Sequence, residues 1–105
     1  EVLHSDLNPT KGREQRGKEY VLVLSPADFN RFGLALVCPI TQGRGFAREH
    51  GFAVSLSAAG TRIRGVVLCH QVRPLACKER GACWVETLPE EIVDDVRARV
   101  RTLLD

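Results

Sequence analysis

Long apolar runs are missing from this 105-residue chain, although 44% of its residues are hydrophobic. A membrane-spanning helix needs about 18 or more consecutive apolar residues, and no stretch of the sequence approaches that length. No segment combines the charged start, apolar middle and small-residue end of a secretory signal. The sequence therefore predicts an ordinary globular protein with no membrane partner.

No cysteine pattern of a metal site or a disulfide framework is present among the four cysteines of the chain, Cys38, Cys69, Cys77 and Cys83. Their spacing matches neither a paired CxxC zinc site nor the dense framework of a disulfide-stapled domain. Three of the four fall in segments that read as strand or buried turn, where a free cysteine behaves as a small hydrophobe. We therefore predict reduced core thiols, a cytoplasmic location, no metal site and no cofactor.

Several common catalytic motifs are also absent. The sequence has no GxxxxGK[ST] phosphate loop, no GxSxG nucleophile elbow and no HExxH zinc motif. The segment "GRGFAREHG" is rich in glycine, but it lacks the spacing and the strand-to-helix context of a dinucleotide-binding loop. It is either a substrate loop or an ordinary surface loop.

Net charge is small, at +2, but positive charge is concentrated in two glycine-punctuated segments. The first, "TKGREQRGKE", includes Arg13, and the second, "QGRGFAREHG", includes Arg44 and Arg48. Basic loops of this kind form surfaces that contact phosphate groups. Solvated loop charges would look the same, so charge alone leaves both interpretations open.

Short strands separated by turn residues dominate the first four fifths of the chain. We expect strands within the segments 1–7, 20–25, 34–41, 51–57, 61–75 and 83–88, and a helical turn within 25–33. No repeat or linker divides the chain, so residues 1–105 are expected to form one domain. This pattern predicts a mainly β, α+β fold: a small, curved, mostly antiparallel sheet or barrel with a C-terminal helix and short helical turns.

The C-terminal helix has the clearest pattern in the sequence. Thr87 and Glu90 have the spacing of a capping box, and Pro89 lies in the expected first turn. Apolar residues recur at helical spacing and predict the buried face: Ile92, Val93, Val96, Val100, Leu103 and Leu104. Three arginines near the helix end are expected to form a solvated face: Arg97, Arg99 and Arg101.

The stretch "RGVVLCHQVR" is predicted to be a buried strand that contains His70. Strict alternation would place His70 on the same face as Leu68 and Arg64, with Gln71 on the opposite face. A histidine here is either a satisfied structural residue or a proton-transfer group, because its unperturbed pKa lies nearest neutrality. Metal-free RNA cleavage needs a base, a cation and an acid. His70 could join Arg13, Glu19 and Thr41 in these roles, if the fold brings them together.

Four stretches resemble, in order and spacing, the MazF/PemK/ChpB toxins, and most closely the PemK and ChpB branches. They are "DLNPTKGREQRG", "VLVLSPADFNRFG", "CPITQGRGFAREHGFAVSL" and "RGVVLCHQVRPL". The C-terminal segment "ACKERGACWVETLPEEIVDDVRARVRTLL" is similar as well, so the resemblance covers essentially the whole chain.

The resemblance implies an SH3-like β-barrel that forms a homodimer. It also implies the toxin half of a type II toxin–antitoxin pair, a sequence-specific endoribonuclease that cuts single-stranded RNA without a metal. The products would carry a 2′,3′-cyclic phosphate and a 5′-hydroxyl. The implied partner is an antitoxin whose acidic, disordered C-terminal segment folds into the RNA groove on binding.

Matched positions suggest which residues contact RNA. Thr41 matches a threonine that positions the scissile phosphate, Phe52 an aromatic position suited to base stacking, and Glu1 an acidic position lining the groove. The full set of expected RNA contacts besides Thr41 is Glu1, Gln42, Arg44, Arg48, His50, Phe52 and Arg64.

The catalytic positions depart from the family pattern. Arg13 stands where the PemK branch often has histidine, and Leu68 and His70 stand where it has arginine and aspartate. Glu19 and Tyr20 stand where many MazF proteins have arginine and proline. The hypothesis we favour is a rewired site, in which His70 acts as acid or base with Glu19, and Arg13 or Arg64 supplies the cation.

Two alternatives remain at this point. The chain could bind RNA or antitoxin without efficient cleavage, since losing one transition-state donor commonly costs about 10²–10³ in rate. A gyrase-directed, CcdB-like toxin is the other alternative, although the matched blocks are those of the ribonuclease branch.

Overall fold

The central strand β3 (Ala35–Thr41) organises the fold of this computed structural model. One edge of β3 pairs with β2 (Lys18–Val23), and the other edge pairs with β5 (Val66–Leu68) and β6 (Arg73–Leu75), all antiparallel. The structure describes residues 2–6, 18–26, 30, 33–42, 51–57, 60–77, 79 and 81–105, with the backbone alone for residues 3–6, 18 and 19.

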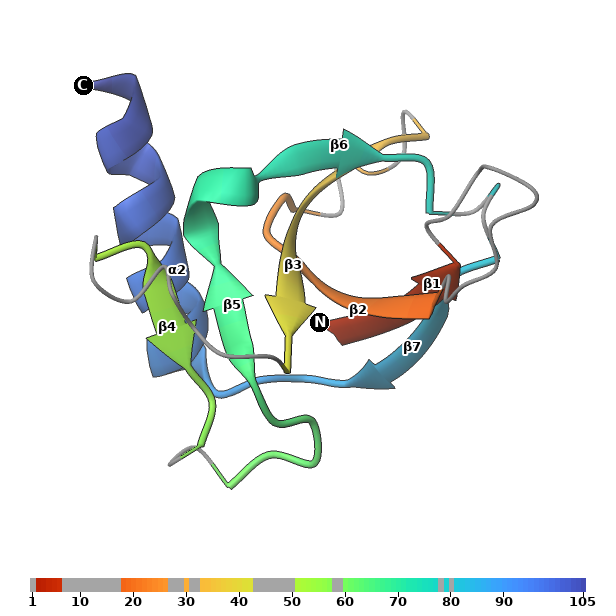
Figure 1. Cartoon of the computed structure of the whole chain (residues 1–105). Helices are drawn as coiled ribbons and strands as arrows, with labels where there is room; N and C mark the ends of the chain where they lie inside the picture. Colours follow the sequence, from red (N-terminus) through yellow and green to blue (C-terminus); the bar gives the residue numbers. More distant parts are fainter. Residues whose placement is uncertain are drawn as a thin grey trace.

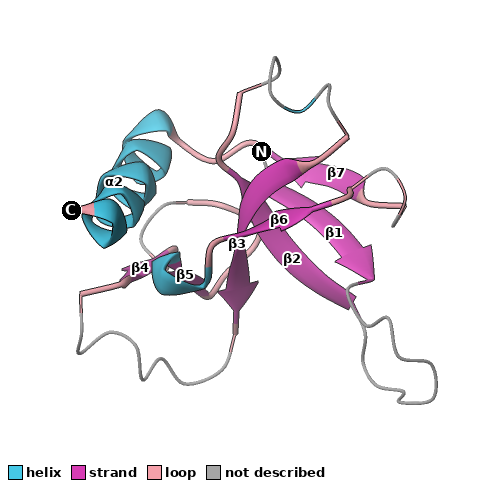
Figure 2. Cartoon of the chain, turned by 90° about the horizontal axis from the view of Figure 1, so that it is seen from above, coloured by secondary structure: helices cyan, strands magenta, loops and turns pink. Residues whose placement is uncertain are grey.

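Three more strands complete the sheet in the order β4-β5-β3-β2-β1-β7. They are β1 (Val2–Asp6), β4 (Ala53–Ser55) and β7 (Cys83–Glu86). The sheet curves strongly, and α2 (Glu90–Arg101) lies beside β4 and the turn that follows β5 (Figures 1 and 2). The prediction of a mainly β, α+β fold with an antiparallel sheet and a C-terminal helix is therefore confirmed.

Alternation along β3 supplies two hydrophobic cores, because successive side chains of a strand point to opposite faces. Cys38 and Ile40 enter the larger core, which also contains Leu22 and Val96. Ala35 and Val37 enter the smaller core on the other face, together with Val21 and Leu75. One strand thus links both cores, and its last residue, Thr41, is placed by the packing on both sides.

The helix packs through part of its predicted apolar face. Val96 is fully buried, and Ile92, Val93 and Val100 pack against the larger core. Leu103 and Leu104 are exposed, at 41% and 86%, so their predicted burial is wrong. The reason is that α2 ends at Arg101 and the chain continues as a 3₁₀ turn (Thr102–Leu104), which breaks the α-helical spacing. Among the described residues, no helix is both long and apolar enough to cross a membrane.

The predicted capping box at the start of the helix is also wrong. The N-cap residue is Pro89, and no side chain caps the helix. A residue that precedes proline is pushed towards extended conformations, so Leu88 cannot begin the helix. Leu88 is instead buried in the larger core, and Thr87 is left exposed one residue earlier.

Two of the three helix arginines are not merely solvated, which corrects a further prediction. The Arg97 guanidinium donates two hydrogen bonds to the carbonyl of Leu24, at 3.2 and 2.8 Å. Arg99 donates to the carbonyl of Gly51 and pairs with Asp95 at 2.8 Å. These contacts fasten α2 to the main chain just after β2 and just before β4, whereas Arg101 is exposed as expected.

The four cysteines are free thiols, but they do not share one environment. Cys38 and Cys69 are buried, as predicted, and burial raises the pKa of these thiols to about 12 and about 11. Burial also raises the pKa of the half-buried Cys77. Cys83 is exposed, because it lies on β7 at the end of the strand order, so its assignment as a core thiol is wrong.

Candidate functional site

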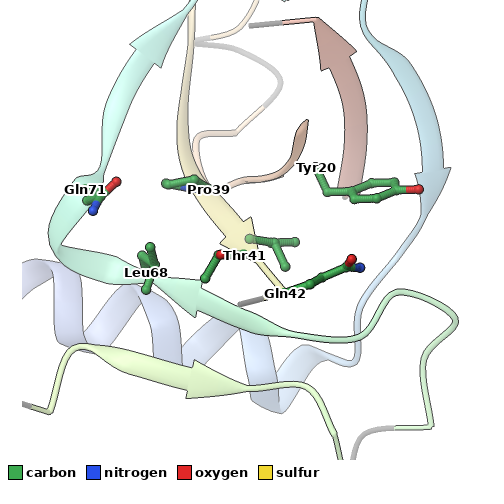
Figure 3. A pocket seen from close by; sticks show the side chains of 7 residues that line it. Tyr20, Pro39, Thr41, Gln42, Leu68 and Gln71 are labelled. Carbon is green, nitrogen blue, oxygen red and sulfur yellow. The ribbon is translucent and has the colours of Figure 1, made fainter. Parts of the chain in front are cut away.

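A pocket of about 400 Å³ lies where β3 ends against β5. Side chains from β2, from β3 and the residue after it, from β5 and from the turn after β5 surround it (Figure 3). The described residues that line it are Tyr20, Pro39, Ile40, Thr41, Gln42, Leu68 and Gln71.

The lining combines an apolar floor with uncharged polar groups. Pro39, Ile40 and Leu68 are buried. Thr41 supplies a half-buried hydroxyl, and Gln42 and Gln71 supply carboxamides. None of the described lining residues carries a carboxylate, ammonium, guanidinium or imidazole group. The part of the pocket that the structure describes is therefore suited to neutral, hydrogen-bonding groups.

Thr41 is held in place by an unusually close backbone approach. Gly65 has φ of +126°, and a Cβ atom there would lie 2.4 Å from the carbonyl oxygen of Thr41. The next residue, Val66, pairs with Thr41 in the sheet. Only glycine fits both the backbone conformation and the space, so Gly65 fixes the distance between Thr41 and the start of β5.

His70 lies in a 3₁₀ turn, not in a strand, and its side chain is exposed, which corrects the prediction of a buried strand histidine. The turn, η2 (Cys69–Gln71), separates β5 from β6. The pairing of β6 with β3 is shifted by three residues relative to the pairing of β5 with β3, and η2 takes up the three extra residues. Strict alternation therefore fails here.

Gln71, which alternation had placed on the opposite face from His70, is the residue of the turn that reaches the pocket. His70 instead packs against Phe52, with ring centroids 6.0 Å apart and a 44° angle between the ring planes. This separation lies within the range of about 4.5–7 Å that is typical of aromatic pairs.

Two backbone contacts hold Phe52 beside His70. The amide of Cys69 donates to the Phe52 carbonyl at 2.8 Å, which joins the turn to the start of β4. The preceding carbonyl, of Gly51, accepts from Arg99 of α2. The half-buried Phe52 ring also packs on the larger core. The His70–Phe52 pair is thus positioned by both the sheet and the C-terminal helix.

The remaining predicted site residues differ in how much of them the structure describes. The exposed Arg64 lies before Gly65, and its carbonyl accepts a 3.3 Å hydrogen bond from the Gln42 amide. Glu19 contributes its backbone to β2, but its side chain lies outside the described part of the structure. Five further residues lie wholly outside the described residues: Glu1, Arg13, Arg44, Arg48 and His50.

The structure therefore brings Thr41 and Gln42 together in one pocket and places Phe52 against His70. The sequence-based selection missed Tyr20 and Gln71 as pocket residues. Tyr20 had one signal in the sequence, since the resemblance implies a proline at its position. Gln71 had none, because the three-residue register shift is invisible in the strand pattern. Among the described residues, no group of three or more His, Cys, Asp or Glu side chains is placed to hold a metal ion.

Comparison with known proteins places this geometry in context. The family described as "PemK-like, MazF-like toxin of type II toxin-antitoxin system" matches residues 1–104. The chain is 46% identical to Endoribonuclease PemK of Escherichia coli, over 99% of the chain and 79% of that protein. It is 38% identical to Endoribonuclease toxin ChpB of Escherichia coli K12, over 100% of the chain and 91% of that protein.

Solved structures agree with the sequence comparison. MazF from Deinococcus radiodurans superimposes with a TM-score of 0.79 at 33% identity, covering 98% of this chain and 91% of that one. A MazE–MazF structure from the same organism gives a TM-score of 0.78 at 30% identity, covering 98% and 89%. Since sequence and fold agree over almost the whole length, the chain belongs to the PemK-like, MazF-like toxin family of type II toxin–antitoxin systems.

Proposed function

We propose that this chain is an endoribonuclease toxin that cleaves single-stranded RNA at specific sequences without a metal ion. The observation that carries the proposal is the pocket beside Thr41, where a hydroxyl and two carboxamides surround an apolar floor large enough for a nucleotide group. The full-length similarity to proteins named as endoribonucleases supports the same conclusion.

The proposed reaction moves one proton off the RNA and one proton onto it. A base removes the proton of a 2′-hydroxyl, and the 2′-oxygen forms a bond to the adjacent phosphorus. The bond from phosphorus to the 5′-oxygen of the next nucleotide breaks, and an acid protonates that oxygen. The products are a 2′,3′-cyclic phosphate and a 5′-hydroxyl, and a cation stabilises the charge that develops on the phosphorane.

The residues that we assign to these steps are those predicted from the sequence. The Thr41 hydroxyl donates to the phosphate, and His70 serves as acid or base from its exposed position beside Phe52. Glu19 completes the acid–base pair. The exposed guanidinium of Arg64, or that of Arg13, supplies the positive charge.

RNA contacts outside the described residues belong to the same proposal. Glu1, Arg44, Arg48 and His50 are expected to line the path of the strand, with Phe52 offering a ring for stacking. Arginines bind phosphate oxygens through charge and through a planar set of donors.

A second candidate function is binding of RNA or antitoxin without efficient cleavage. Leu68 stands where the resemblance expects an arginine, and it is buried at 6% exposure in the pocket floor. Leucine gives no charge stabilisation, so cleavage depends on a cation from elsewhere in the chain.

A single-turnover cleavage assay separates these candidates. The protein is mixed with a long, weakly structured RNA in the presence of EDTA, alongside the His70→Ala and Arg13→Ala variants. We expect discrete cuts with 5′-hydroxyl ends that weaken in both variants. RNA that is bound but intact at high protein concentration would support the binding function. Inhibited DNA supercoiling with intact RNA would instead point to gyrase.

We also propose that the chain forms a homodimer in the cytoplasm and is neutralised by an antitoxin with an acidic, disordered C-terminal segment. A solved relative contains MazE together with MazF, and Leu34 and Leu36 expose apolar surface at 44% and 39%. Sedimentation equilibrium tests the dimer, since a mass near that of one chain at micromolar concentration would contradict it.

A further inference from the structure

We infer that Tyr20, Gln42 and Gln71 form a nucleobase-binding pocket beside Thr41. In this pocket the base stacks on Tyr20, and the carboxamides of Gln42 and Gln71 determine which base is accepted at one position of the RNA. The inference rests on the proposed function, because it names the group that this pocket takes. Tyr20 and Gln71 were not among the expected RNA contacts.

The size and lining of the pocket favour a base over a phosphate. Ligand pockets commonly enclose about 300–1,000 Å³, and this one encloses about 400 Å³. Phosphate oxygens are recognised by arginine, lysine and clustered N–H donors, whereas base edges are read by amides and base faces rest on aromatic or apolar surfaces. The described lining is uncharged and offers the second combination.

Tyr20 provides the aromatic wall. Its ring stands on one side of the pocket, above the Gln42 side chain (Figure 3), and it is steadied by packing against the larger core. Stacking on an aromatic ring tolerates every base, because each base has a π face. Tyr20 therefore contributes affinity, and selection between bases falls to the polar groups.

The two carboxamides provide that selection from opposite sides of the pocket (Figure 3). The Gln42 nitrogen donates to the Arg64 carbonyl at 3.3 Å, which orients the amide and leaves its oxygen as an acceptor. The Gln71 side chain is exposed to solvent at the pocket rim. A carboxamide pairs a donor with an acceptor, the pattern that base edges also present.

Thr41 fixes which nucleotide the pocket reads. In Figure 3 its side chain lies between the two carboxamides, and the proposed function has its hydroxyl binding the scissile phosphate. A base in the pocket then belongs to a nucleotide next to that phosphate. We therefore expect selection at one position immediately beside the cut, rather than along the whole recognition sequence.

Cut-site sequencing on a pool of RNA with randomised positions tests the inference. The protein is compared with Gln71→Met, Gln42→Met and Tyr20→Ala in EDTA. Methionine keeps the length of glutamine but removes the amide. We expect the base preference at the position beside the cut to fall at least about fivefold in the two glutamine variants, because each loses a specific contact with the base. The base preference at the other positions should be retained.

Matched controls keep the result interpretable. Trp84→Ala removes an aromatic side chain, 59% exposed, that lies outside the pocket, and it should leave every preference unchanged. Because Gln71 is exposed, its variant is expected to fold, which thermal unfolding of each variant checks. Unchanged preference in both glutamine variants would overturn the inference, while cleavage by the unmodified protein would leave the proposed function intact.

A binding measurement tests the pocket even if no cleavage occurs. Short 2′-deoxy oligonucleotides, which lack the attacking hydroxyl, are varied in base at one position and titrated into the unmodified protein and Gln71→Met. Base-dependent affinity that disappears in Gln71→Met supports the pocket. Equal affinity for all four bases overturns it. A failure of cleavage alone would contradict the proposed function and not the pocket.

Discussion

At Gly65 the backbone passes closer to Thr41 than any residue with a side chain allows. We expect Gly65→Ala to move β5 away from Thr41, because the new Cβ atom would lie 2.4 Å from the Thr41 carbonyl oxygen. Gly60→Ala is the matched control. Its φ is also positive, at +72°, but apart from its chain neighbours no atom of the described residues lies within 4 Å of the new Cβ.

Chemical denaturation and RNA cleavage measure the difference between the two glycine variants. Gly60→Ala carries only the left-handed backbone cost of about 1–2 kcal/mol. Gly65→Ala should lower the free energy of unfolding by more than this and should also reduce cleavage. Equal losses of stability with full cleavage in both variants would show that the approach of Gly65 does not position Thr41.

The buried thiols predict a reactivity order and a pH dependence. Alkylation near pH 8 should modify the exposed Cys83 before Cys38 and Cys69, which are buried. Burial raises the pKa of Cys38 from 9.0 to about 12 in the folded state. The native state therefore holds this proton while the unfolded state releases it, so stability should fall as pH rises above about 9.

Mass spectrometry of alkylated peptides checks the order of reaction, and denaturation at a series of pH values checks the sign. The Cys38→Ser variant should lose stability because of its buried hydroxyl, so Cys38→Ala is the better comparison. Its unfolding free energy should vary less with pH above 9 than that of the unmodified protein.

At the scale of elements, the attachment of α2 depends on its arginines and not on a cap. We expect Thr87→Ala to change the free energy of unfolding by less than about 0.5 kcal/mol, whereas loss of a real N-cap costs about 0.5–2 kcal/mol. Thr87 is exposed, and no side chain caps this helix.

Arg97→Met should be the more damaging change in the same helix. We expect it to lower the free energy of unfolding by about 1–2 kcal/mol, because the Leu24 carbonyl loses both of its hydrogen bonds from Arg97. Arg101→Met is the matched control, since Arg101 is exposed on the last turn of α2. Urea unfolding of the three variants ranks them, and equal effects at positions 97 and 101 would contradict the proposed attachment.

The spacing of hydrophobic residues, together with the turn residues between them, was sufficient to predict most strands and the side of the helix that faces the core. Alternation cannot reveal the shift between β5 and β6, because it is fixed by how two segments pair with β3 over a long sequence separation. Likewise, the sequence pattern places Pro89 in the first turn of the helix, whereas the effect of Pro89 on Leu88 decides where the helix begins.

The candidate site was predictable where it follows a strand end. Thr41 and Gln42 were selected from the sequence and do line the pocket, whereas Gln71 reaches it through the turn that alternation could not anticipate. Tyr20 departs from the residue that the resemblance implies, but its place in the pocket depends on packing against the larger core, which the strand pattern does not predict.

At the scale of the whole molecule, β3 joins the two cores and should make them unfold together. Leu22 lies in the larger core and Leu75 in the smaller. We expect Leu22→Ala and Leu75→Ala each to lower the free energy of unfolding by about 2–5 kcal/mol, with one unfolding transition in each variant. Fluorescence of Trp84, the one tryptophan of the chain, and far-ultraviolet circular dichroism should report the same transition. Separate transitions would mean that the chain contains two independent units.

The contacts of Arg97 and Arg99 bear on which substitutions this protein can tolerate during evolution. Both guanidinium groups bind main-chain oxygens, of Leu24 and Gly51, which every amino acid possesses. Substitutions that alter the side chains of those two segments therefore need not loosen the helix, provided the backbone path is kept. The anchoring of α2 therefore places no requirement of its own on the side chain at position 24, whereas position 51 still favours glycine because its φ is +76°.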